Sequence, residues 1–254
     1  MQSLIYDGSF EGFLSAVFDV YEYKFTDADI CPASRYNGNL FLPHHAVLTD
    51  GERSQRVLKG LEKKLPSENL KEIYRSFLSE LPEREKYLLQ YIRYAFSSNE
   101  KMESDFSHPA VLWVSQTARK VYREKHRMEA FVRFQKTADD LFFSLIEPDY
   151  DVLPLIEEHF TSRYADQRWL IYDLKRKYGL YYDLQATAGI TLDFIPEAGG
   201  GKDLSSVYES SEEKYQSLWQ QYFKSVNIAS RKNTKLHLQH MPARYWKYLT
   251  EKKG

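Results

Sequence analysis

The stretch WLIYDLKRKYGLYYDL, residues 169–184, decides the class of fold. It contains two runs of aromatic and apolar side chains, Trp169 to Leu174 and Tyr178 to Leu184, around a turn at Arg176 to Gly179. Such residues favour extended strands, and a short turn containing glycine between two such runs predicts a hairpin. Helical spacing dominates the chain before this region. The sequence therefore predicts an α+β protein, with a largely helical N-terminal part followed by an antiparallel sheet of two hairpins flanked by helices.

The other hairpin is predicted upstream of this stretch. From Glu129 to Lys136, alternate side chains fall on opposite sides, as they do in a strand. The residues from Thr137 to Asp140 then turn the chain into a second strand at Leu141 to Ile146. Helical spacing returns from Val152 to Tyr164. A fifth strand is expected at Ile190 to Phe194.

The first hundred residues carry mainly helical signals after one strand at Ser3 to Tyr6. Apolar side chains recur at helical spacing from Phe10 to Tyr21 and in three further segments, Arg53 to Leu65, Asn69 to Leu81 and Glu83 to Phe96. A longer helix is expected to begin at a Ser107 cap with Pro109 in its first turn, and a final helix runs from Pro242 through Leu249. We expect a largely helical part at 1–105 and a sheet with flanking and C-terminal helices at 106–254, as two domains or one continuous domain.

Composition predicts a globular protein, because 43% of the 254 residues are hydrophobic and 15% are aromatic. No apolar run approaches the roughly 20 residues of a membrane helix. The N-terminal MQSLIYDGSF lacks the basic and apolar segments of a signal peptide. We therefore expect a cytoplasmic protein without a membrane partner. The lone cysteine, Cys31, is too few for a disulfide, a Cys-rich zinc site or an iron–sulfur cluster, so the sequence assigns no cofactor and no metal to this chain.

The net charge of -1 conceals two basic blocks. Residues 116–136 carry seven basic and two acidic side chains, and residues 224–254 carry eight basic side chains and one acidic one. Phosphates attract Arg and Lys, whereas exposed Trp, Tyr and His stack on unpaired bases. The alternative is a solvated basic surface with its aromatic residues anchored in the core. The predicted nucleic-acid-binding residues are Arg119, Lys120, Arg123, Arg127, Arg133, Arg231, Lys232, Lys235, His237, His240, Arg244, Tyr245, Trp246 and Lys247.

Candidates for catalysis are fewer. Asp149 and Asp151 follow a predicted strand and are able to act as bases, although carboxylates there also satisfy turns and cap a helix. Asp166 is equally open to both interpretations. His237 and His240 lie three residues apart, but the chain contains no HExxH pattern that would favour a metal site. The sequence therefore leaves the catalytic residues undetermined.

Four segments resemble an uncharacterised bacterial family associated with DNA repair or DNA metabolism. They are YDGSFEGFLSAVFD at 6–19, ARKVYREKHRMEAFVRFQ at 118–135, IEPDYDVLPLIEEHFTSRYADQRWLIYDLKRKYGLYYD at 146–183 and NIASRKNTKLHLQHMPARYWKYLTEK at 227–252. The resemblance implies DNA as the partner. It also implies a neighbouring gene for a radical-SAM protein, and a similar domain fused to a uracil-DNA glycosylase-like domain. It carries over no catalytic residue.

Because one cysteine cannot hold the cluster of radical-SAM chemistry, a partner would supply it. The leading hypothesis is a DNA-binding protein of repair or metabolism that acts with that iron–sulfur partner, its two basic blocks folded onto one surface. Two alternatives stay open. One is a stand-alone DNA-processing enzyme of the nuclease or glycosylase kind, and the other is a protein-interaction scaffold whose basic blocks dock on acidic partners.

Overall fold

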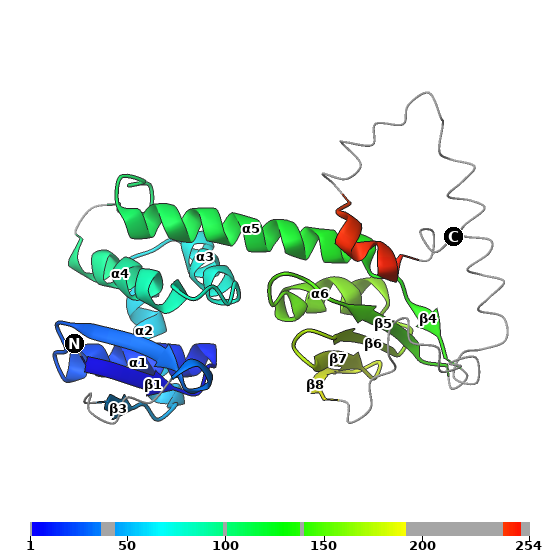
Figure 1. Cartoon of the computed structure of the whole chain (residues 1–254), viewed down its shortest axis with the longest axis horizontal. Coiled ribbons are helices and arrows are strands. Elements are labelled where there is room, and N and C mark those ends of the chain that lie inside the picture. Colours follow the sequence, from blue (N-terminus) through cyan, green and yellow to red (C-terminus); the bar gives the residue numbers. More distant parts are fainter. Residues whose placement is uncertain (1, 37–43, 99–100, 138–139, 192–240, 250–254) are drawn as a thin grey trace. The chain divides into compact units, whose positions relative to one another are not determined.

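The structure is a computed structural model that describes residues 2–36, 44–98, 101–137, 140–191 and 241–249. It contains helices and two separate sheets, which confirms the predicted α+β class (Figure 1). The chain forms two compact units, Met1–Tyr122 and Arg123–Gly254, whose boundary falls within the long helix α5 (Pro109–Phe131). Among the described helices, none combines the length and apolar character needed to cross a membrane.

The first unit contains a small parallel sheet of three strands, β1 (Gln2–Tyr6), β2 (Ala28–Pro32) and β3 (His44–Ala46), with β1 in the centre. The predicted strand at Ser3 to Tyr6 is confirmed. Sequence reasoning missed β2 and β3. The segment ADICP is mixed in polarity and HHA spans only three residues, so neither shows an alternating pattern long enough to read.

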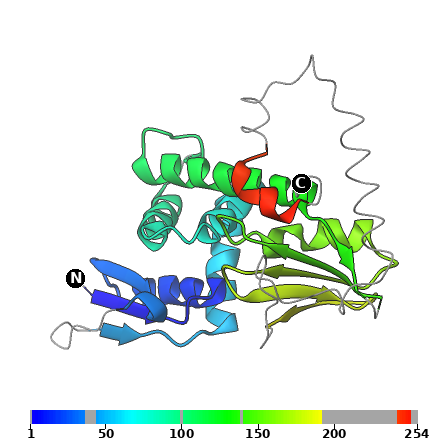
Figure 2. The same cartoon turned by 45° about the vertical axis from the view of Figure 1, so that its right-hand side comes forward.

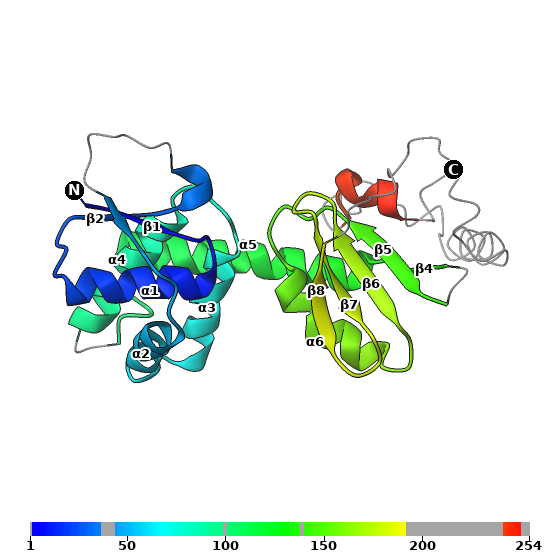
Figure 3. The ribbon, with the colours of Figure 1, turned by 90° about the horizontal axis from the view of Figure 1, so that it is seen from below.

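Helix α1 (Phe10–Glu22) begins immediately after β1 and packs on this sheet (Figure 3). The Ser9 hydroxyl accepts a hydrogen bond from the Gly12 amide at 2.9 Å, and the Asp7 carboxylate accepts from the Ser9 amide at 2.9 Å. A β-carbon on Gly12 would collide with the Asp7 carboxylate, so the absent side chain makes room for this cap. The start of α1 is therefore satisfied by the protein's own side chains.

Four more helices of the first unit follow from predicted segments. These are α2 (Gly51–Glu62), α3 (Ser67–Phe77), α4 (Arg84–Ser97) and the first part of α5. Their bounds agree with the predicted ones to within a few residues. The predicted Ser107 cap of α5 is wrong by one residue, because the His108 Nδ1 accepts the hydrogen bond of the Ala110 amide at 3.2 Å. Ser107 instead donates its amide and its hydroxyl to the Asp105 carboxylate.

A buried polar network ties the first turn of α4 to β1. Glu85, 2% exposed, accepts hydrogen bonds from the Tyr6 hydroxyl and the Arg84 Nε, both at 2.8 Å. Arg35, which ends the short 3-10 turn η1 (Ala33–Arg35), donates to the second Glu85 oxygen at 2.5 Å. Burial alone would raise the pKa of Glu85, but the hydrogen bonds from Arg84 and Arg35 outweigh it and lower that pKa. The network holds α4 in a fixed position on the parallel sheet.

The second unit contains a five-stranded sheet in the order β4-β5-β6-β7-β8. Its strands are β4 (Gln135–Lys136), β5 (Phe142–Ile146), β6 (Trp169–Asp173), β7 (Tyr178–Tyr182) and β8 (Thr187–Ile190). The two predicted hairpins are present as the antiparallel pairs β4/β5 and β6/β7. The strands that join them, β5 and β6, pair in parallel, so the sheet is mixed. Helix α6 (Leu153–Arg163) carries the chain back between them, as a parallel connection requires.

Two predicted strands differ from the structure. Glu129 to Lys136 is helical as far as Phe131, and only Gln135 and Lys136 are extended. The buried pair Met128 and Val132, four residues apart, satisfies helical spacing and overrides the short alternating pattern. A fifth strand lies at Thr187–Ile190, so it begins three residues before the predicted strand at Ile190 to Phe194; residues 192–194 of that prediction are outside the described part of the chain.

The core of the second unit forms between the sheet and α6. Strand β6 lies in the middle of the sheet (Figure 3). All five of its residues are buried, and Trp169 is fully buried. The Phe160 ring on α6 contacts the Trp169 ring at a centroid distance of 6.1 Å, and Phe134 contacts both rings. Because β5 and β6 are parallel, both end at one edge of the sheet, and the segments that follow them lie close together there.

Candidate nucleic-acid interface

Three cations of the first basic block lie exposed on one helix. Arg119, Lys120 and Arg123 belong to α5 and are all exposed. Spacings of three and four residues place these side chains on neighbouring positions of one helix face. None of the three forms a salt bridge with a described residue, although the Arg119 charge opposes the rise in the pKa of Glu72 that burial causes. We call these residues the α5 stripe.

The other predicted residues of this block have partners inside the protein. The Arg127 guanidinium lies 3.4 Å from the Glu124 carboxylate, one turn earlier on the same helix. Arg133 donates to the backbone oxygens of Ala130 and Val132, at 2.7 and 3.2 Å. The first basic block therefore contains both the exposed α5 stripe and side chains that form contacts within the protein.

The second block is described only at its end, where residues 243–248 form a 3-10 turn, η4 (Ala243–Tyr248), in place of the predicted final helix. We call this segment the terminal turn; it lies beside β5 (Figure 2, red). The Arg244 guanidinium pairs with Asp149 at 2.6 Å and with Glu124 at 3.2 Å, and Lys247 pairs with Glu147. Trp246 donates its indole N–H to the Met241 carbonyl at 3.1 Å. Arg231, Lys232, Lys235, His237 and His240 lie outside the described residues.

Glu124 is the centre of this arrangement, and it is only 1% exposed. One of its oxygens accepts from the Asp149 amide at 2.9 Å and from the Tyr245 hydroxyl, and the other faces Arg244 and Arg127. Tyr245 is 2% exposed, so the terminal turn inserts this ring into the second unit. A buried carboxylate is tolerated only where its charge is compensated, and here two guanidinium groups compensate it.

The loop after β5 is held by cations from the turn after β6. The Arg176 guanidinium donates to the Asp173 carboxylate at 2.7 Å and to the carbonyl oxygens of Pro148 and Asp149, at 3.2 and 3.1 Å. The Lys175 ammonium also donates to the Asp149 carbonyl, at 3.0 Å. Asp173 is fully buried and accepts the Lys175 amide at 2.8 Å as well. The loop therefore has its backbone and its carboxylates bound to the protein's own donors.

Three tyrosines donate to acidic residues of this cluster. The Tyr178 hydroxyl donates to Asp151 at 2.5 Å, the Tyr248 hydroxyl donates to Glu147 at 2.7 Å, and Tyr245 donates to Glu124. Burial raises the pKa of each tyrosine, and the adjacent carboxylate raises it further. These phenols stay protonated and act as neutral donors around neutral pH.

The carboxylate of Glu147 is shifted in the opposite direction. Hydrogen bonds from Lys247 and then Tyr248 lower the pKa of Glu147. The ionised form of Glu147 is thus the one that holds the terminal turn, through the Lys247 ammonium and the Tyr248 hydroxyl.

The predicted catalytic residues are only partly brought together. Asp149 and Asp151 both lie in the loop at the end of β5, where Arg244 and Tyr178 bind them. Asp166 is exposed on the segment between α6 and β6. Within the described residues, no group of three His, Cys, Asp or Glu side chains is arranged to hold a metal ion.

Three further charged residues organise this region: sequence reasoning selected neither Glu124 nor Arg176 for it, and it left Asp173 undecided between a catalytic and a structural role. Each is buried or half-buried although charged. The available signal was weak. Glu124 stands among basic residues of an amphipathic helix, and Asp173 ends an otherwise apolar strand, so both resemble ordinary surface charges in a sequence.

The chain matches a known family of domains. A family described as a domain of unknown function, DUF4130, matches residues 82–251, about two thirds of the chain. The matched range includes α4, α5, the whole five-stranded sheet and the terminal turn. Neither the curated proteins nor the solved structures contain a significant match to this chain.

Proposed function

The chain belongs to the DUF4130 family of domains of unknown function, and we propose that it binds nucleic acid in DNA repair or DNA metabolism through the α5 stripe. The observation that carries this proposal is the exposure of Arg119, Lys120 and Arg123 on one helix without salt bridges to described residues. Exposed cations at helical spacing attract phosphates, and each phosphate they neutralise releases counterions.

The terminal turn has a different role in this proposal. Arg244 and Lys247 face carboxylates at ion-pair distance, so these carboxylates already compensate their charge. A phosphate would have to displace those carboxylates, one of which is almost fully buried. We assign the turn to holding the loop after β5, and the α5 stripe to the nucleic acid.

The proposed setting in DNA repair or metabolism, with a radical-SAM partner, rests on the four segments that resemble the bacterial family described above. The single cysteine supports a division of labour, because an iron–sulfur cluster needs several thiolates that this chain does not have. In this proposal the chain binds the DNA and the partner carries out the redox chemistry.

The salt dependence of DNA binding tests the proposal. The affinity of the whole protein for an oligonucleotide is measured by fluorescence anisotropy between about 50 and 200 mM salt. Three phosphate contacts give a log-log slope of about -2 to -3, and the combined variant Arg119→Gln, Lys120→Gln, Arg123→Gln removes most of that slope. A matched control removes three exposed lysines elsewhere, Lys59, Lys63 and Lys86, with the same change in net charge. Equal slopes for the two triple variants, or no binding by the wild type, would overturn the proposal.

The alternative of a stand-alone enzyme would use Asp149 and Asp151, which lie in the loop at the carboxyl end of β5. This strand pairs in parallel with β6, and ligands often bind at the carboxyl ends of parallel strands. Its test is incubation of the purified chain alone with lesion-containing oligonucleotides, with and without divalent metal. Turnover that Asp151→Asn abolishes, in a variant that keeps its fold, would favour this alternative over the binding role.

A further inference from the structure

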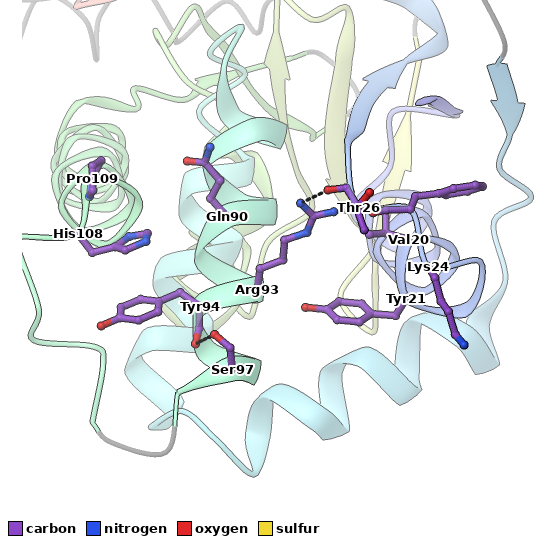
Figure 4. A pocket seen from close by; sticks show the side chains of 11 residues that line it. Val20, Tyr21, Lys24, Thr26, Gln90, Arg93, Tyr94, Ser97, His108 and Pro109 are labelled. Atoms are coloured by element: carbon purple, nitrogen blue, oxygen red, sulfur yellow. Dashed lines mark hydrogen bonds between the residues drawn. The ribbon is translucent and has the colours of Figure 1, made fainter. Parts of the chain in front are cut away.

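An open cavity of about 780 Å³ lies on the surface of the first unit. It is lined from the end of α1, the segment that follows it, the last two turns of α4 and the start of α5 (Figure 4). A volume of this size is in the range of small-molecule sites. Six of its lining residues supply aromatic, cationic or amide groups: Tyr21, Lys24, Gln90, Arg93, Tyr94 and His108.

The aromatic part of the lining is held in place by the protein itself. The Tyr94 and His108 rings stack at a centroid distance of 4.3 Å and an angle of 10° (Figure 4). The Tyr94 hydroxyl donates to Asp105 at 2.8 Å, which fixes that ring. Tyr21, 44% exposed, is braced edge-on against Phe96 at 5.5 Å. Rings that are already oriented give stacking surfaces at little cost in conformational entropy.

The polar part of the lining is positively charged. Arg93 donates to the carbonyl oxygens of Thr26 and Phe25, at 3.1 and 2.8 Å, so its guanidinium is anchored at the wall (Figure 4). Lys24 is exposed at the rim, with a backbone φ of 55°. Gln90 is exposed and contributes an amide that both donates and accepts. Cations beside aromatic faces and an amide are the groups that bind a nucleotide.

The position of the cavity on α5 connects it with the stripe. His108 stands at the start of α5, and Arg119 follows on the same helix within the first unit. At 1.5 Å per residue, the helix covers roughly 16 Å between them. A strand whose phosphates lie on the stripe therefore reaches the cavity within a few nucleotides.

We propose that this cavity binds one unpaired nucleotide of the DNA, with its base against the aromatic lining and its phosphate beside Lys24. The inference rests on the proposed function and adds to it a preference for DNA that contains an unpaired base. Such a site takes any base that is free to leave the stack, because stacking depends little on sequence.

The test compares three forms of one oligonucleotide: a fully paired duplex, the same duplex with a single bulged 2-aminopurine, and that duplex with an abasic bulge. Anisotropy reports affinity, and 2-aminopurine fluorescence reports stacking. We expect the wild type to bind the 2-aminopurine bulge about tenfold more tightly than the abasic one and to quench its fluorescence.

Two variants and two matched controls locate the site. Tyr21→Ala should abolish the discrimination, whereas Tyr23→Ala, 52% exposed and outside the lining, should retain it. Lys24→Asn should weaken binding of the bulged duplex and reduce its salt slope by about 0.7 to 0.9. Asn tolerates a positive φ, so this variant keeps its fold. Lys177→Asn makes the same change at a residue with φ of 59° in the second unit and should have no effect.

The outcomes separate the two proposals. Equal affinity for all three duplexes, with unquenched 2-aminopurine and a normal salt slope, would overturn the cavity proposal and leave the α5 stripe intact. The cavity proposal would also be overturned if Tyr21→Ala and Tyr23→Ala discriminated equally between the 2-aminopurine bulge and the abasic bulge. Failure of every duplex to bind would overturn the proposed function itself.

Discussion

The α5 stripe and the terminal turn contain the same kinds of residue in different electrostatic surroundings. The cations of the terminal turn face Glu124, Glu147 and Asp149, and its central tyrosine is buried. Those of the stripe are exposed and form no salt bridge with the described residues. Density of positive charge along a sequence therefore does not show which cations are available to a polyanion. The position of the carboxylates in the folded chain decides it.

Removal of the carboxylate at the centre of the terminal turn's network should have the largest effect. Glu124→Ala leaves the Asp149 amide, the Tyr245 hydroxyl and two guanidinium groups without their common acceptor. We expect a loss of about 3 to 5 kcal/mol in the free energy of unfolding, measured by urea denaturation. The exposed Glu158 is the control, because Glu158→Ala should change stability by less than about 0.5 kcal/mol. Similar midpoints for the two variants would show that the network contributes little.

A reciprocal pair of arginine substitutions sharpens the comparison. Arg244→Gln should lower the free energy of unfolding by about 1 kcal/mol, because its ion pairs are partly exposed, and should leave the salt slope of DNA binding unchanged. Arg123→Gln should leave stability within about 0.5 kcal/mol and reduce that slope by about 0.7 to 0.9. Denaturation and anisotropy on the same two samples give both readouts. The reverse pattern would assign the nucleic acid to the terminal turn.

The smallest expected effect is a dependence on pH at the edge of the terminal turn. Contact with the terminal turn lowers the pKa of Glu147 below its ordinary value of 4.5. The protein with the turn in place therefore binds fewer protons than the protein with the turn detached. The contribution of Glu147 is present above about pH 4.5 and is lost as the pH falls through the lowered pKa. The protection factors for hydrogen exchange of the Tyr245 and Leu249 amides, which close the turn, should fall in that acidic range. Lys247→Gln removes the main cause of the shift and should weaken this dependence; an unchanged profile would mean that another group is responsible.

Local sequence patterns predicted the elements whose side chains keep helical or strand spacing over their whole length. The hairpin at residues 169–182 and the helices at 51–97 follow from runs of side chains that match one geometry throughout. Strands β2 and β3 are short and mixed in polarity, and they are strands because β1 offers both its edges to them. The parallel pairing of β5 and β6 likewise depends on where α6 packs, which a hairpin pattern does not reveal.

The candidate site was predictable in its members and less so in its organisation. Asp149, Arg244, Tyr245 and Lys247 were all selected from the sequence, as possible bases or phosphate ligands. Their mutual pairing joins residues about a hundred positions apart, through a buried Glu124 that looks like an ordinary helix charge. Whether a charged side chain binds a ligand or its own chain depends on such distant partners.

The sequence by itself determined the α+β class, the positions of most helices and the hairpins, and the presence of two basic blocks, because these depend on residues close together in the chain. Tertiary structure decided which strands pair in parallel, which cations meet a carboxylate and which rings surround a cavity. The physical reason is that electrostatic and packing energies depend on distance in space, and a position in the sequence fixes that distance only within a few turns of a helix or a hairpin.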